Sequence, residues 1–301
     1  MLLPIVHTPS YDAKFAPGHR FPMSKYRALA DAIMREGLAE PGDFHVPPPA
    51  PDNWVKLAHD AAYVDKVFAC TVPEKVEKVI GFPIDERTAL RARCAVAGTI
   101  MAARLALEHG VACNTAGGSH HAGRAHGAGF CTFNDVAVAA RLMIADGEIA
   151  NALVLDLDVH QGDGTAAIFA GDDSVFTASI HAEKNYPARK AASDYDLGLP
   201  DGMGDTAYLK TLALVLEELR DRIEPALVFY NAGVDVHGED KLGRLALTDH
   251  GIEQRERMVL SHFRSREIPV CGVIGGGYSN DIEALAQRHV ILHRVANDFI
   301  F

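Results

Sequence analysis

The stretch 156–163 holds the side chains that most directly predict chemistry in this sequence. Asp156, Asp158 and His160 occupy alternate positions, directly after the apolar run 150–154 that is typical of a buried strand. Side chains at alternate positions of a strand share one face, so we expect these three to project together where the strand ends. Two carboxylates and an imidazole on a core face need a cation or hydrogen bonds to neutralise them.

A metal ion is the simplest such cation. Carboxylate oxygen and imidazole nitrogen together suit Zn²⁺, Fe²⁺, Co²⁺ or Mn²⁺. Asp158 and His160 would supply two ligands, and Asp235, just after another predicted strand, is the best candidate for the third. Three protein ligands leave one position open for water and substrate, which is typical of a catalytic metal. The alternative is a polar strand end that passes into a turn without a metal.

Other polar side chains could transfer protons or stabilise charge beside such a metal. His120 and His121 lie in a glycine-rich loop and could take a proton from water and give one to a leaving amine, unless they are ordinary surface residues. Asp156 and Asp163 could each accept a ring N–H and fix a tautomer. Tyr278 follows three glycines and could donate a hydrogen bond to a developing oxyanion, although such a loop can also be a tight turn or an anion-binding nest.

The elements that must position these residues alternate between apolar runs and helix-like segments. Strands are expected at residues 3–7, 112–115, 152–157, 175–180, 227–231 and 269–274, and helices at 26–35, 91–108, 135–145, 206–223 and 248–265. This order predicts an α/β fold, a single three-layer α/β/α domain over 1–301 with a mostly parallel central sheet. Four predicted strands run into polar or glycine-rich clusters, and carboxyl ends of parallel strands meet at one edge.

Composition excludes several other classes of function. The formal net charge is -11 and no block of lysine and arginine stands out, so we expect no nucleic-acid partner. The five cysteines are scattered and contain no C-x-x-C, which fits reduced thiols. No apolar run is long enough to span a bilayer, and the start lacks the pattern of a secretion signal. We therefore expect a cytoplasmic protein without a membrane partner; the sequence does not indicate its oligomeric state.

Together the motifs resemble the zinc-dependent histone deacetylase family, which has the arginase–deacetylase fold. The matching segments keep the family's order and lie at 117–122, 129–131, 156–164, 231–235 and 276–278. The resemblance implies that Asp158, His160 and Asp235 bind Zn²⁺, with Fe²⁺ or Co²⁺ as alternatives. It also implies a K⁺ beside the zinc, held by Asp156, Asp158, His160, Ser179 and Ile180.

The resemblance further implies roles around the metal. His121 would be the proton shuttle beside His120, and Tyr278 would polarise the acyl carbonyl. A tunnel for the acyl-lysine would be lined by Gly129, Phe130, Tyr186 and Leu242. The basic residue of an inner pocket would be Lys25 or Arg27.

Two segments, 17–23 and 98–102, are most similar to the class IV, histone deacetylase 11-like branch and its bacterial relatives. By this resemblance, Leu90 stands where class I members carry a rim aspartate, and Leu242 stands where polyamine-specific members carry a glutamate. The first difference weakens the expectation that the protein binds the backbone of a peptide substrate. The second argues against a polyamine substrate.

We therefore expect a metal-dependent amide hydrolase that removes acetyl or longer acyl groups from lysine ε-amines. The substrate would be an acylated lysine in a protein or peptide, or a small acylated amine. The alternatives are another metallohydrolase on the same fold, including a ureohydrolase with two Mn²⁺, and a non-catalytic binder of acyl-lysine. Intact His121 and Tyr278 disfavour the binder, because binding alone needs neither.

Overall fold

A single parallel sheet forms the centre of this computed structural model, which describes residues 2–16 and 18–300. Its strands are β1 (Ile5–Val6), β2 (Val111–Asn114), β3 (Ala152–Asp156), β4 (Val175–Ala182), β5 (Tyr195–Leu199), β6 (Val228–Asn231) and β7 (Val270–Val273). They lie in the order β1-β2-β7-β6-β3-β4-β5, and every neighbouring pair is parallel. Pro17, in the segment 17–23, and both ends of the range 1–301 lie outside the described residues.

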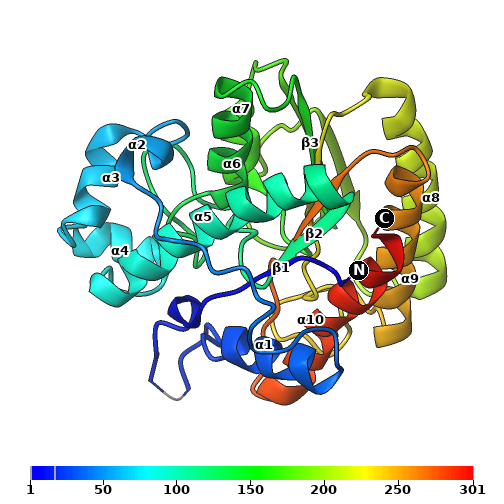
Figure 1. Ribbon diagram of the computed structural model, residues 1–301, viewed down its shortest axis with the longest axis horizontal. Helices are drawn as coiled ribbons and strands as arrows, with labels where there is room; N and C mark the ends of the chain where they lie inside the picture. Colours follow the sequence, from blue (N-terminus) through cyan, green and yellow to red (C-terminus); the bar gives the residue numbers. More distant parts are fainter. Residues whose placement is uncertain (1, 17, 301) are drawn as a thin grey trace.

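Helices cover both faces of this sheet, as the predicted three-layer α/β/α fold requires. They are α1 (Lys25–Arg35), α2 (Asp52–Val55), α3 (Ala61–Phe68), α4 (Glu74–Ile80), α5 (Glu86–His109), α6 (Asp135–Ala145), α7 (Asp163–Phe169), α8 (Asp205–Arg222), α9 (Asp249–Arg264) and α10 (Ile282–Ala296). In Figure 1, α2, α3 and α4 gather at one end of the molecule, while α8 and α9 lie at the opposite end. No helix within the described ranges is both long and apolar enough to cross a membrane.

Alternating side chains of the strands enter two separate hydrophobic cores. In β3, Leu153 and Leu155 pack into the core shared with α1, α8, α9 and α10, whereas Val154 packs into the core shared with α3, α5 and α6. A parallel sheet covered on both faces buries every strand position, which explains why these strands read as continuous apolar runs.

The six predicted strands and five predicted helices are all present; α6 has the predicted bounds, and the others differ at one or both ends. The helix expected at 91–108 begins earlier, at Glu86, because Asp85 caps it: the Thr88 N–H donates to Asp85 at 2.9 Å, and the Asp85 N–H donates to the Thr88 hydroxyl at 2.8 Å. Strand β5 and helices α2, α3, α4, α7 and α10 were not predicted.

The carboxyl edge of the sheet brings the functional segments together. Asp156, the last residue of β3, is in register with Asn231 of β6 on one side and Ser179 of β4 on the other. The loops after β2, β3, β6 and β7 therefore leave from neighbouring positions, as expected for the site-bearing edge of a parallel sheet.

Candidate active site

The turn after β3 is shaped by its own carboxylates. The strand ends at Asp156, so Asp158 and His160 do not continue its alternation, contrary to the sequence prediction. Instead, the Asp158 N–H donates to Asp156 at 3.1 Å and the His160 N–H donates to Asp158 at 2.9 Å. These local bonds compete with strand pairing and fold the chain into a turn that directs Asp158 and His160 toward the loop after β6.

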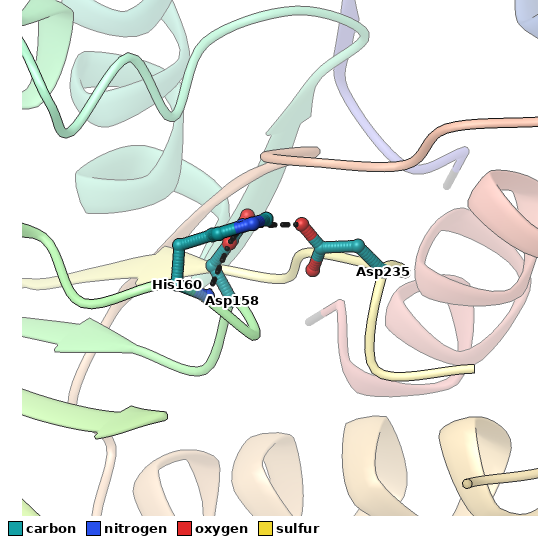
Figure 2. A group of neighbouring side chains, drawn as sticks. All are labelled: Asp158, His160 and Asp235. Carbon is teal, nitrogen blue, oxygen red and sulfur yellow. Dashed lines mark hydrogen bonds and ion pairs between the residues drawn. The ribbon is translucent and has the colours of Figure 1, made fainter. Parts of the chain in front are cut away.

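Asp158, His160 and Asp235 converge from two loops, as Figure 2 shows. Their candidate ligand atoms all lie within 4.8 Å of one another, and all three residues are buried. The His160 Nδ1 lies 3.0 Å from an Asp158 oxygen and 3.1 Å from an Asp235 oxygen. The Gly276 N–H donates to Asp158 at 2.7 Å, and a Cβ at Gly276 would collide with Asp235, so only glycine allows this loop so close.

The charge on this group calls for a cation. Burial and the neighbouring Asp158 carboxylate raise the pKa of Asp235 to about 7. Burial would lower the pKa of His160, but its bonds to Asp158 and Asp235 outweigh it and raise that pKa to about 10. Two carboxylates this deeply buried are stable only beside positive charge, and their oxygens with one imidazole are a donor set that suits a divalent metal. The residues present therefore fit the metal that the sequence predicted.

Each histidine of the pair His120 and His121 bonds to its own carboxylate. The His120 Nδ1 lies 2.6 Å from Asp156, and the His121 Nδ1 lies 2.7 Å from Asp163, the pairing expected from the sequence. The two ring centroids are 4.1 Å apart. Gly129 packs so closely against His121 that a Cβ at this position would collide with the imidazole ring.

The two histidines differ in basicity. Burial lowers the pKa of His120, but the Asp156 and Asp158 carboxylates oppose it and raise that pKa to about 9. Burial lowers the pKa of His121 to about 4. The difference arises because the full negative charge of Asp156 acts on His120. His121 is therefore the neutral ring and the available base.

Tyr278 lies beside the three candidate metal ligands. Its ring centroid is 6.1 Å from that of His160, at an angle of 89°. Asp240 holds this segment: it accepts hydrogen bonds from the backbone N–H of Tyr278 at 2.6 Å and of Leu242 at 2.8 Å. Asp240 was not predicted, because a carboxylate in a loop carries no distinguishing pattern.

A cavity of about 390 Å³ leads to this group. His121, His160 and Tyr278 line it, together with the four predicted tunnel residues Gly129, Phe130, Tyr186 and Leu242. The Phe130 and Tyr278 ring centroids are 5.8 Å apart, and Tyr186 meets His121 edge-on at 4.8 Å. Leu90, expected at the rim, is not among the described residues that line the cavity, because it lies on the outer surface of α5.

A basic residue that was not predicted lies next to the candidate metal ligands. A cavity of about 20 Å³ behind Tyr278 is lined by Arg91 of α5, which bonds to the Tyr26 hydroxyl. Lys25 is buried, but its Nζ donates to the Gly275 carbonyl at 3.1 Å and so braces the glycine loop. Arg27 is exposed and lines neither this pocket nor the larger cavity. The choice between Lys25 and Arg27 for the basic residue of an inner pocket stays a prediction, and Lys25 is the one next to this cavity, because Gly275 lines it.

The predicted K⁺ ligands lie on adjacent elements. Asp156 and Ser179 are register partners, and Ile180 follows Ser179 in β4. The Asp156 side chain already accepts from Asn231 at 2.9 Å, and the Ser179 hydroxyl is 3.0 Å from His181 Nδ1. The five predicted K⁺ ligands thus lie on β3, β4 and the turn after β3, at the carboxyl edge of the sheet. K⁺ binding stays a prediction.

Comparison with known proteins adds to this geometry. Residues 19–293 match the histone deacetylase domain. The chain is 47% identical to an uncharacterized protein of Picosynechococcus sp., covering 99% of each chain, and 28% identical to histone deacetylase 2 of Arabidopsis thaliana, covering 96% of this chain and 80% of that one. It shares its fold with the crystal structure of an HDAC homolog complexed with SAHA, with a TM-score of 0.83, 24% identity, and 99% and 85% of the two chains covered.

Proposed function

The chain belongs to the histone deacetylase family, and from that membership we propose that it is a metal-dependent hydrolase that removes acyl groups from lysine ε-amines. Family membership itself supports deacetylase activity. One observation carries the finer proposal: Asp158 and Asp235 converge on His160, which lines the same cavity as His121 and Tyr278. A donor set for a metal, a neutral base and a phenol thus meet at one point.

Asp158, His160 and Asp235 would hold the metal, which we propose to be Zn²⁺, with Fe²⁺ or Co²⁺ as alternatives. Such an ion supplies Lewis-acid chemistry, which polarises an amide carbonyl and acidifies water. We propose that K⁺ binds beside it, through Asp156, Asp158, His160, Ser179 and Ile180, because these residues gather at the same sheet edge.

His121 is the proposed acid–base residue. Its Nδ1–H donates to Asp163, which fixes the tautomer and leaves Nε2 free to accept a proton from the attacking water. The protonated ring is then stabilised by Asp163 and gives the proton to the leaving amine. His120, with its raised pKa, contributes positive charge beside the developing negative charge.

Tyr278 is the proposed hydrogen-bond donor to the substrate carbonyl. Burial and the nearby carboxylates Asp158 and Asp235 raise its pKa well above the usual range, so the phenol keeps its proton and can donate. The bond strengthens as charge develops on the carbonyl oxygen, and so favours the transition state. Phe130 and Tyr186 would line the path of the neutral acyl-lysine side chain.

The remaining sequence expectations continue as proposals. We propose that residues 1–301 form one catalytic domain, that the chain belongs to the class IV branch and that the protein is cytoplasmic. The similarity of segments 17–23 and 98–102 supports the class IV assignment.

A panel of acyl-lysine peptides of increasing acyl length, with acetylated small amines alongside, tests the function. Each is incubated with Zn²⁺-reconstituted protein, and the freed amine is quantified. We expect release from at least one acyl-lysine peptide and its loss on chelation. Release from small amines alone would contradict the peptide substrate, and release from no substrate would contradict the function.

A further inference from the structure

We propose that the acyl-lysine substrate lies in an acidic stretch of polypeptide, because basic side chains surround the mouth of the cavity. This inference rests on the proposed function and names the substrate class that the same site would select.

The basic side chains come from four separate segments. They are Arg20 in the N-terminal loop, Lys78 in α4, Lys184 after β4 and Arg244 after β6. All four are exposed, whereas His121 and His160 at the inner end of the same cavity are buried. The cations therefore mark the outer end. No aspartate or glutamate is among the described residues that line this cavity.

Ion pairs neutralise only part of this positive charge. No ion pair within the described residues involves Arg20, and Lys184 and Arg244 share one carboxylate, Asp201, at 3.9 and 3.1 Å. Lys78 pairs with Glu74 at 2.7 Å, with both side chains about three-quarters exposed. Exposed pairs of this kind are weak and give way to a better partner. The mouth is thus positive in a chain whose formal net charge is -11.

This charge acts on the residues around the acyl-lysine. Acylation removes the charge of lysine, so the target side chain is not repelled. Neighbouring lysines and arginines are repelled, while aspartates and glutamates are attracted. The free lysine of the product regains its charge and is repelled as well.

The structure places the attraction outside the acyl group. At the inner end, the acyl group would meet the side chains of Asp158, His160 and Asp235, a donor set whose carboxylates are suited to a metal and not to an anionic tail. A negative charge is therefore favoured in the peptide flanks that cross the mouth, beside Arg20, Lys78, Lys184 and Arg244.

Three matched peptides test this proposal. Each carries one acetyl-lysine, flanked on both sides by two glutamates, two alanines or two lysines, and kcat/KM is measured at low and high salt with Zn²⁺-reconstituted enzyme. We expect the glutamate peptide to exceed the lysine peptide by on the order of tenfold at low salt, with the difference shrinking as salt rises. Equal values for the three would overturn the inference and leave the proposed function standing. No hydrolysis of any peptide would overturn both.

Charge reversal identifies the residues responsible. We expect the double variant Arg20→Glu and Lys78→Glu to lose or invert the preference. Lys75→Glu is the matched control for the single variant Lys78→Glu, because both lysines are exposed on α4 but only Lys78 lines the cavity. A preference lost equally in the control would show that only net charge matters. A neutral peptide with a succinyl-lysine serves as a further arm, and its preference over the glutamate-flanked acetyl peptide would place the anion in the acyl group and contradict the proposal.

Binding provides a readout independent of turnover. In the His121→Ala background, fluorescence anisotropy of labelled peptides should give the same order of affinities. An order that appears in kcat/KM but not in affinity would contradict recognition at the mouth.

Discussion

At the scale of single residues, Tyr278 is placed to act through one hydroxyl group. Tyr278→Phe should leave the fold and the metal-binding group intact, because the backbone bond to Asp240 does not use the hydroxyl. Removal of one oxyanion donor typically costs about 10²–10³ in rate. We expect this loss in kcat with little change in KM, measured on an acetyl-lysine peptide. A near-normal kcat would show that Tyr278 only lines the cavity.

Substitutions of His121 and His120 should differ in their effects on turnover. His121→Ala removes the proposed proton-transfer group, which typically contributes about 10²–10⁴ in rate, and should abolish turnover while a hydroxamate still binds. His120→Ala should impair turnover but leave it measurable, since His120 supplies charge. Steady-state kinetics and hydroxamate titration of both variants check this. If His120→Ala is the less active of the two, the assigned roles are reversed.

The candidate metal ligands could be predicted from sequence, while Arg91, which lines the small cavity behind Tyr278, could not. Asp158, His160 and Asp235 follow predicted strands, and the carboxyl ends of parallel strands meet whatever the loops do. Arg91 lies within a long helix among buried residues, and only the packing of α5 beside Tyr26 of α1 brings it to the site. No local pattern marks such a residue.

At the scale of elements, the predictable parts were those buried on both sides. Strands β3, β6 and β7 are buried throughout. Strand β5 lies at the sheet edge, where alternate residues such as Asp196 and Gly198 are exposed, so its pattern resembles a loop. Helix α10 was not predicted, although Asp281 is a favoured capping residue at its start. Asp281 accepts a hydrogen bond from the Ala284 N–H at 3.0 Å.

His59, between α2 and α3, connects these elements to the loop that carries His120 and His121. Its Nδ1 donates to the Gly123 carbonyl at 2.8 Å, and its Nε2 accepts from the Asn134 N–H at 2.9 Å. Burial lowers its pKa to about 4 from 6.5, so the unfolded state takes up a proton first as the pH falls. His59 therefore contributes stability that is present above pH 6.5 and is lost toward pH 4, by roughly 3 kcal/mol at most.

Urea unfolding at pH 7 and pH 5 tests this prediction. The free energy of unfolding of the wild type should fall between these values by more than that of His59→Gln, which has no titrating ring. The variant should be less stable at pH 7, because it loses a paired buried group. An identical fall with pH in both proteins would show that His59 does not contribute.

At the scale of the whole molecule, the fold class followed from the order of elements, but the surface charge did not follow from composition. The net charge of -11 indicates an acidic protein, yet the cavity mouth gathers Arg20, Lys78, Lys184 and Arg244. These residues are distant in sequence and are assembled only by the fold. The proposed preference for acidic substrates accordingly rests on the three-dimensional structure and not on composition.

The metal content of reconstituted protein, measured together with peptide hydrolysis, tests the central claim most directly. Stripped wild type titrated with Zn²⁺ should reach its full activity at one ion per chain, since Asp158, His160 and Asp235 are the predicted ligands. Asp158→Ala should bind no ion at this site and be inactive while remaining folded. Asp163→Asn, which removes a carboxylate bonded to His121 and not a proposed ligand, should keep the ion. Full metal occupancy in Asp158→Ala, or undiminished hydrolysis by the metal-free wild type, would contradict the account.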